Sequence, residues 1–143
     1  MIIKCKEDLN LKDIEVLISY AYKDQTVDQL ITMIKSVDKK VKCKSGEIET
    51  WKCASEIYYI ESVDKRTFVY CKNEVYQSEL RLYQLIEELF DAGFVQISKS
   101  CIINLKMLDY IKPLFNSRME ATLINGERVN VTRKFIPGIK ERL

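Results

Sequence analysis

The chain contains no histidine, and its 143 residues include only four glycines and two prolines. Without histidine the Ser-His and Cys-His catalytic arrangements, the commonest metal ligand and a phosphohistidine relay are all excluded. The few glycines form no glycine-rich loop of the kind that cradles nucleotide phosphates. We therefore expect that the protein is not an enzyme and that it binds no cofactor.

The cysteines form no metal or redox motif. There are five of them, widely spaced and with no C-x-x-C pair: Cys5, Cys43, Cys53, Cys71 and Cys101. Most lie in apolar or strand-like stretches, where a free cysteine behaves as a small buried hydrophobe. We interpret them as structural residues and expect no metal site.

Long apolar runs are also missing. No segment approaches the ~20 residues that a membrane helix needs, and no basic stretch followed by an apolar one marks a signal peptide. We therefore expect a cytoplasmic protein. With 47% apolar and 31% charged residues, the composition is typical of a globular domain with its own core.

Arginine is absent from the first part of the chain. The net charge of +2 is too small to predict a nucleic-acid partner, but every arginine lies after residue 56. Guanidinium groups suit bidentate contacts with phosphate and guanine. A chance bias on a solvated surface would produce the same distribution, so charge alone leaves both interpretations open.

Residues 1–40 predict a β-β-α extension. Residues 2–6 and 15–20 have the β-branched, apolar character of strands. Thr26 can then cap a helix. Its apolar residues with helical spacing are Val27, Leu30, Ile31 and Ile34. The extension is too small for a core of its own, so we expect it to pack on the rest of the chain or on a partner.

Residues 41–143 form the second predicted unit, which is built mainly from short strands. The predicted strands cover residues 41–44, 48–52, 57–61, 67–71, 75–77, 94–97, 102–105, 108–111, 118–123 and 127–132. One clear helix interrupts them, with Ser78 as its expected N-cap and Gly93 closing its C-terminus. Its apolar stripe consists of Leu82, Leu85, Ile86 and Leu89. A short helix is expected over 137–143, which makes the fold class mainly β with α (α+β).

The last predicted hairpin can be assigned a register. A two-residue turn at Asn125-Gly126 would mix apolar and polar side chains on each face. A three-residue loop with a left-handed Gly126 instead places Ala121 opposite Val129 and Met119 opposite Val131. Because a slip of one residue turns a whole strand over, we predict the second register, which leaves Arg128 on the polar face.

Several segments of residues 41–143 resemble the LytTR family of DNA-binding domains. They are residues 56–62 (EIYYIES), 68–70 (FVY) before the helix, 94–105 (FVQISKSCIINL), and the turn at 125–126 followed by 131–134 (VTRK). The resemblance implies a LytTR-type stack of small antiparallel sheets with one central helix, preceded here by the β-β-α extension. It also implies a sequence-specific, DNA-binding transcription regulator.

The resemblance further implies which loops meet DNA. In this family, loops at one sheet edge enter successive major grooves and contact the backbone between them. Carried over by position, the contact residues are Lys65, Arg66 and Thr67 in the first loop, Ser98, Lys99 and Ser100 in the second, and Thr132, Arg133 and Lys134 in the third. Each loop combines a cation with a hydroxyl group, a suitable set of phosphate ligands, and arginine can read guanine.

Two positions depart from the family pattern. Lys99 stands where the family usually has arginine or asparagine, and Thr67 where some members have histidine. Ser100 and Asn104 can instead hold nearby backbone, because serine and asparagine side chains readily bond to it. For Asn104 we favour that structural role.

In organisation the chain resembles short stand-alone LytTR regulators that have no receiver domain. The partners implied are double-stranded DNA, a second copy of the chain (a homodimer on paired direct repeats) and, as in some systems of this family, a membrane-bound inhibitor protein encoded alongside. Residues 1–40 are then a candidate surface for dimerisation or for the inhibitor, with packing alone as the simpler interpretation. A protein-interaction module that binds no DNA is the alternative function.

Overall fold

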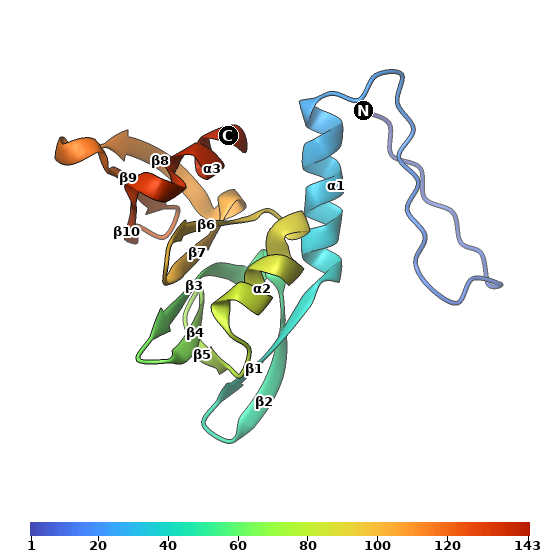
Figure 1. Ribbon diagram of the computed structural model, residues 1–143. Coiled ribbons are helices and arrows are strands. Elements are labelled where there is room, and N and C mark those ends of the chain that lie inside the picture. Colours follow the sequence, from blue (N-terminus) through green and yellow to red (C-terminus); the bar gives the residue numbers. More distant parts are fainter.

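The computed structural model describes residues 1–143 as two antiparallel sheets and three helices (Figure 1). The larger sheet has the strand order β2-β1-β5-β4-β3-β7-β6, and the smaller one has the order β10-β9-β8. The strands are β1 (Lys40–Ser45), β2 (Ile48–Cys53), β3 (Ile57–Val63), β4 (Arg66–Cys71), β5 (Val75–Ser78), β6 (Phe94–Ser98), β7 (Cys101–Asn104), β8 (Leu108–Pro113), β9 (Met119–Leu123) and β10 (Arg128–Val131). The helices are α1 (Gln25–Asp38), α2 (Leu82–Leu89) and α3 (Ile136–Glu141). None of them has the length and apolar content required to cross a bilayer.

The larger sheet separates two apolar cores. Because successive side chains of a strand point to opposite faces, one strand can serve both cores. In β7, Ile102 packs into the core that α2 covers with Leu85. Its neighbour Ile103 packs into the core formed with the smaller sheet and α3, which includes Leu123. This stack of sheets with a central helix confirms the predicted mainly β fold.

The strands predicted after residue 40 are all present, close to their predicted bounds. The β9–β10 register is also confirmed, since Ala121 pairs with Val129 and Met119 with Val131. Gly126 has a φ of 87°, the left-handed conformation that the three-residue loop requires. Separating apolar from polar side chains was therefore sufficient to select this register.

Two predicted helix caps are wrong. α1 is capped by Asp24, whose Oδ1 accepts a hydrogen bond from Val27 N at 3.0 Å, rather than by Thr26. α2 begins at Leu82, because Ser78 is held in β5 opposite Thr67 and its Oγ accepts from Leu80 N at 3.1 Å. In both cases a neighbouring polar group or strand pairing takes the place of the expected cap.

The two strands predicted at residues 2–6 and 15–20 are not formed. Residues 1–23, here called the N-terminal arm, leave the N-terminal end of α1 and double back on themselves without joining either sheet (Figure 1). A strand needs a backbone partner, and the arm's hydrogen bonds are local, such as Leu11 N to Asp8 O at 3.2 Å. Of the predicted β-β-α extension only the helix forms. The domain boundary at residue 40 stays a prediction.

Candidate nucleic-acid interface

The first and second predicted loops lie side by side in the structure. β3 pairs with β7, so the β3–β4 turn at residues 64–65 adjoins the β6–β7 turn at 99–100. Ser62 N donates a hydrogen bond to Ser100 O at 2.8 Å, which ties the two hairpins together next to their turns. Both loops therefore open at the same edge of the larger sheet, on the left of Figure 1.

Thr132 joins the third predicted loop to this edge. Its N donates to Ile97 O at 2.9 Å, and its Oγ1 lies 3.4 Å from the same oxygen. Ile97 directly precedes the second loop, so Arg133 and Lys134 emerge beside it, and both are exposed. The structure thus brings together three loops that lie far apart in the sequence. We call this surface the loop edge: residues 64–67, 98–100 and 132–134.

The first loop is a two-residue turn in an unusual conformation. Asp64 and Lys65 have φ values of 51° and 64°, and the flanking residues Val63 and Arg66 are paired. Such turns usually carry glycine, because the left-handed region costs other residues about 1–2 kcal/mol each. Strain of this kind concentrates at functional positions. The turn keeps Lys65 and Arg66 exposed at its tip.

Thr67 does not share this exposure. It lies inside β4 between Ser62 and Ser78, and only 4% of its surface is accessible. Its hydroxyl is therefore enclosed by neighbouring strands, and the structure gives no support for the DNA contact expected of it. It helps instead to form the strand that presents Arg66.

The second loop is shaped by its serines and presents its lysine. Ser98 Oγ accepts from Ser100 N at 3.2 Å, and Gln96 Nε2 donates to Ser98 O at 2.9 Å. Lys99, at the tip, is exposed and lies in none of the ion pairs of the molecule. Ser98 therefore positions the turn, and Lys99 is left available to an external anion.

Arg133 is linked to a fourth segment, the β8–β9 connection. Its Nη2 donates to Asn116 O at 3.4 Å, and Asn116 and Ser117 are both left-handed, with φ values of 70° and 65°. Arg118 follows them and is exposed. No prediction from the sequence included this connection in the site. The predicted pairing of Met119 with Val131 could have located it, because that pair places residue 118 beside Thr132.

Two further cations adjoin the first loop. A shallow hollow next to Lys65 and Arg66 is also lined by Lys44 and Arg81. Both were missed because they belong to β1 and to the start of α2, distant in sequence from the loop. Arg81 enlarges the positive surface beside the loop edge, whereas Lys44 is paired with Glu79, which lines the same hollow.

Asn104 has the structural role that we favoured. It is fully buried, its Nδ2 donates to Ile57 O at 2.9 Å, and its Oδ1 accepts from Lys106 N at 3.1 Å. Nδ2 also lies 3.4 Å from Ala54 O. The side chain thus satisfies backbone groups at the far end of β7 from the loop edge.

The residues beneath the loop edge are buried. Cys101, directly after the second loop, is buried, and this burial, together with the nearby Glu61 carboxylate, raises the pKa of its thiol to about 12. The rings of Tyr59 and Tyr70 stack at a centroid distance of 4.1 Å, and burial raises the pKa of both hydroxyls. These groups stay protonated near neutral pH, so none of them supplies a nucleophile or base.

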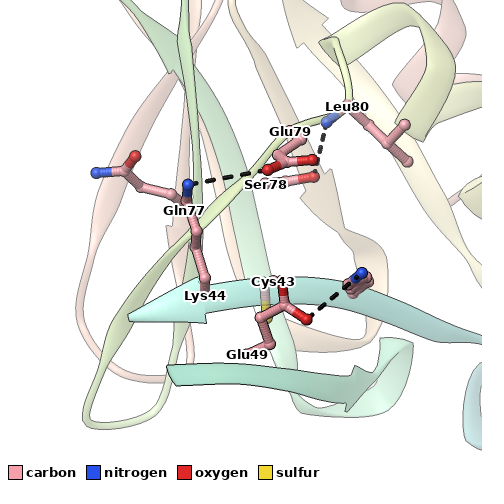
Figure 2. Close-up of a pocket in the computed structure, with 8 residues that line it drawn as sticks. Cys43, Lys44, Glu49, Gln77, Ser78, Glu79 and Leu80 are labelled. Atoms are coloured by element: carbon pink, nitrogen blue, oxygen red, sulfur yellow. Dashed lines mark hydrogen bonds and ion pairs between the residues drawn. The ribbon is translucent and has the colours of Figure 1, made fainter. Parts of the chain in front are cut away.

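A pocket between β1 and β5 offers no comparable site (Figure 2). Lys44 Nζ lies 3.9 Å from Glu79 Oε1, and Lys42 Nζ lies 3.5 Å from Glu49 Oε2. Burial raises the pKa of the one thiol there, Cys43. The charged groups of this pocket thus neutralise one another, in contrast with the unpaired cations of the loop edge.

Comparison with known families identifies domains that are similar to this chain. Residues 52–143 match the family model described as the LytTr DNA-binding domain. A solved structure, the "LytTr DNA-binding domain of putative methyl-accepting/DNA response regulator from Bacillus cereus", superposes with a TM-score of 0.66 at 25% sequence identity. The superposition covers 71% of this chain and 94% of that one. The fold therefore extends over nearly all of a known domain of this kind.

Similar curated proteins are longer regulators. The chain is 29% identical over 99 residues to "Sensory transduction protein LytT" of Enterococcus faecalis, covering 68% of this chain and 41% of that protein. It is 32% identical over 63 residues to "Transcriptional regulatory protein YpdB" of Escherichia coli K12, covering 44% of this chain and 26% of that protein. The chain therefore spans less than half the length of these relatives.

Proposed function

The chain belongs to the LytTR family of DNA-binding domains, and we propose that it is a sequence-specific transcription regulator whose loop edge contacts the major grooves of duplex DNA. One observation carries the proposal. The hydrogen bonds from Ser62 to Ser100 and from Thr132 to Ile97 fix three cation-bearing loops at a single edge. Loops held in this way can meet successive grooves of a duplex without rearrangement.

The side chains of the loops are assigned to different contacts according to their chemistry. Arg133 has a planar fork that can bond to guanine O6 and N7, so we assign it to base recognition. Lys65 and Lys99 are point charges at turn tips, and Arg66 and Lys134 lie beside them, so we assign these four to phosphates. Three hydroxyl-bearing residues support them as turn-forming or backbone-contacting groups: Ser98, Ser100 and Thr132. Thr67, being buried, is assigned no contact with DNA.

Two copies are proposed to bind together. Paired direct repeats about one helical turn apart would place both loop edges on one face of the DNA. A homodimer on DNA then gains affinity because the second contact is made within an existing complex.

Control of the regulator is proposed to come from another protein. The resemblance to short regulators supports a cytoplasmic protein that works without a receiver domain and is held by a membrane-bound inhibitor encoded alongside. Immunoblotting of cell extracts tests the size of the native protein. Co-purification of the protein with solubilised membranes of the same cells tests whether a membrane-bound inhibitor holds it.

Selection of bound sequences from random duplexes tests the function itself. We expect an enriched motif, bound with an affinity that falls steeply as salt rises, because each neutralised phosphate releases counterions. Failure to enrich any sequence, together with salt-independent or absent binding, would favour the interaction-module alternative.

A further inference from the structure

The second half of the N-terminal arm has the pattern of a strand that lacks its sheet. Over residues 14–22 one face of an extended chain would carry only apolar side chains: Ile14, Val16, Ile18, Tyr20 and Tyr22. The other face carries Glu15, Ser19 and Ala21, with Leu17 as its one large apolar residue. This alternation is typical of a strand with one buried face. In the structure Ile14 is 89% and Tyr22 is 86% exposed, and only Ile18 of this face is half-buried, so most of the face is unpartnered.

The first half of the arm matches it. Met1, Ile3 and Cys5 alternate with Lys4 and Lys6. The arm already doubles back (Figure 1), and a hairpin that pairs Lys6 with Glu15 would place Ile3 opposite Ile18. Met1, Ile3 and Cys5 would then join the apolar face of residues 14–22, while Ile2 would lie on the other face.

α1 presents a second unpartnered apolar surface. It packs on the body of the molecule through Val27 and Ser36, which are buried, and through Thr32, whose Cγ2 lies 3.0 Å from the Cβ position that a side chain at Gly93 would occupy. A second apolar stripe, consisting of Leu30, Met33, Ile34 and Val37, is less covered. Met33 and Val37 are 50% and 58% exposed. The helix therefore leaves part of its apolar surface uncovered by its own domain, although Val27 is buried and Leu30 is half-buried.

We propose that the N-terminal arms of two copies pair as antiparallel strands about a twofold axis at Ile18, forming a four-stranded sheet that covers both α1 stripes. The occupant of the exposed surface is thus a second copy of this chain. A single arm could form only a two-stranded hairpin, which is marginal by itself and leaves residues 14–22 as an open edge. Two arms pair those edges with each other, as closed twofold symmetry requires.

The charges of the strand select this register. With Ile18 opposite Ile18, Val16 faces Tyr20 and Ile14 faces Tyr22, so one face is wholly apolar. On the polar face Asp13 of each copy lies opposite Lys23 of the other, and no like charges face each other. Lys23 is held at its end of the strand by an ion pair with Asp28, 3.6 Å away. A pairing centred on Leu17 instead would place Lys12 of each copy opposite Tyr22 of the other, with no opposite charge facing it.

The available area is sufficient for a stable dimer. A large aliphatic or aromatic side chain buries roughly 60–120 Å² of apolar surface. The face of the arm and the α1 stripe together therefore offer on the order of 1,000 Å² per copy, against about 800 Å² per partner in a standard interface. Exposed apolar patches of this size mark interaction surfaces.

The test compares two variants of the full chain by light scattering during gel filtration, over a concentration series without DNA. We expect the parent to have twice the 16.8 kDa mass of one chain. Ile18→Asp, which places two carboxylates at the twofold axis, should give a monomer. Leu17→Asp makes the same change on the opposite face of the strand and should remain a dimer. A monomeric parent, or an Ile18→Asp protein that still dimerises, would overturn the proposal.

Crosslinking checks the register in a Cys5→Ser background. Ile18→Cys should form a disulfide-linked dimer under mild oxidation, because the two copies of position 18 face each other, whereas Ser19→Cys should not. Equal crosslinking at both positions contradicts the register. The role of this dimer on paired DNA sites rests on the proposed function. The two proposals can nevertheless fail separately. Binding to a single DNA site tests the loop edge, and the molar mass of the protein without DNA tests the arm.

Discussion

The loop edge and the N-terminal arm differ in how their residues are held. At the loop edge, charged side chains stand on turns that backbone hydrogen bonds such as Ser62 N to Ser100 O fix to one another. In the arm, apolar side chains such as Ile14 stand on an extended chain that nothing in its own molecule holds. The first surface is assembled within one copy. The second is complete only when another chain supplies the missing strands.

This difference predicts that the two regions can be inactivated separately. Changes in the arm should alter how copies combine and leave the contact between one copy and DNA intact. Changes at the loop edge should do the reverse.

Removal of the arm separates the regions most strongly. Deletion of residues 1–23 should weaken binding to paired repeats by about 100-fold, because the second site is no longer reached through a preformed dimer. Binding to a single site and the melting temperature should change little, since the arm makes no contact with either core. Fluorescence anisotropy on one-site and two-site duplexes measures both affinities. Equal loss on both duplexes would mean that the arm acts through the fold.

The stability of the protein at alkaline pH distinguishes the buried residues beneath the loop edge from the exposed arm. Burial raises the pKa of Cys101 from its ordinary value of 9.0 to about 12. Between these values the folded chain keeps a proton that the unfolded chain has released, so the free energy of unfolding falls as pH rises. One such group contributes a slope of up to about 1.4 kcal/mol per pH unit.

Replacement of the two thiols isolates this contribution. Urea unfolding between pH 8.5 and 11 should show a shallower decline for Cys101→Val than for the parent. Cys5→Val, the matched change in the exposed arm, should follow the parent. An unchanged slope in Cys101→Val would mean that the thiol is already open to solvent.

Relief of the strain in the first turn should stabilise the fold and weaken DNA binding. Lys65→Gly removes a left-handed lysine that costs about 1–2 kcal/mol, at an entropic cost of about 0.5–1 kcal/mol for glycine. We expect a protein more stable by roughly 0.5–1 kcal/mol that binds DNA less well than the parent, as judged by chemical denaturation and anisotropy. A more stable variant with undiminished affinity would remove Lys65 from the interface.

The smallest expected effect is that of one phosphate contact. Lys99→Ala should weaken binding to specific and random duplexes alike and reduce the salt slope by about one unit. Lys72→Ala is the matched control, because Lys72 is exposed in the turn at the opposite end of β4 from the loop edge. Identical salt slopes for the two variants would place Lys99 outside the contact surface.

The sequence predicted the region after residue 40 well because its signals are local. Alternating side chains specified β9 and β10, and a left-handed Gly126 specified their register. The three loops came from resemblance to a family, and in the structure they lie at one edge of the larger sheet. The burial of Thr67 was not predictable, because it depends on β5 lying beside β4.

Residues 2–6 and 15–20 show the opposite case. Their β-branched, alternating pattern predicted strands, yet the strands are not formed within one chain. The alternation of apolar and polar residues indicates that one face of a strand is to be buried. It does not indicate whether the same chain or another molecule covers that face. The helix cap at Ser78 failed for a related reason, since a strand partner competed for that residue.

The central claim is that the loop edge reads DNA, and paired arginine variants test it most directly. Arg133 and Arg128 are both exposed; Arg133 follows β10, whereas Arg128 is its first residue, at the end away from the loop edge. Arg133→Ala should cost about 1–3 kcal/mol on the selected site and relax base preference at one position, whereas Arg128→Ala should change neither. Titration of both folded variants against the selected site and its single-base variants is the measurement. An Arg133→Ala protein that binds and discriminates DNA like the parent would contradict the account.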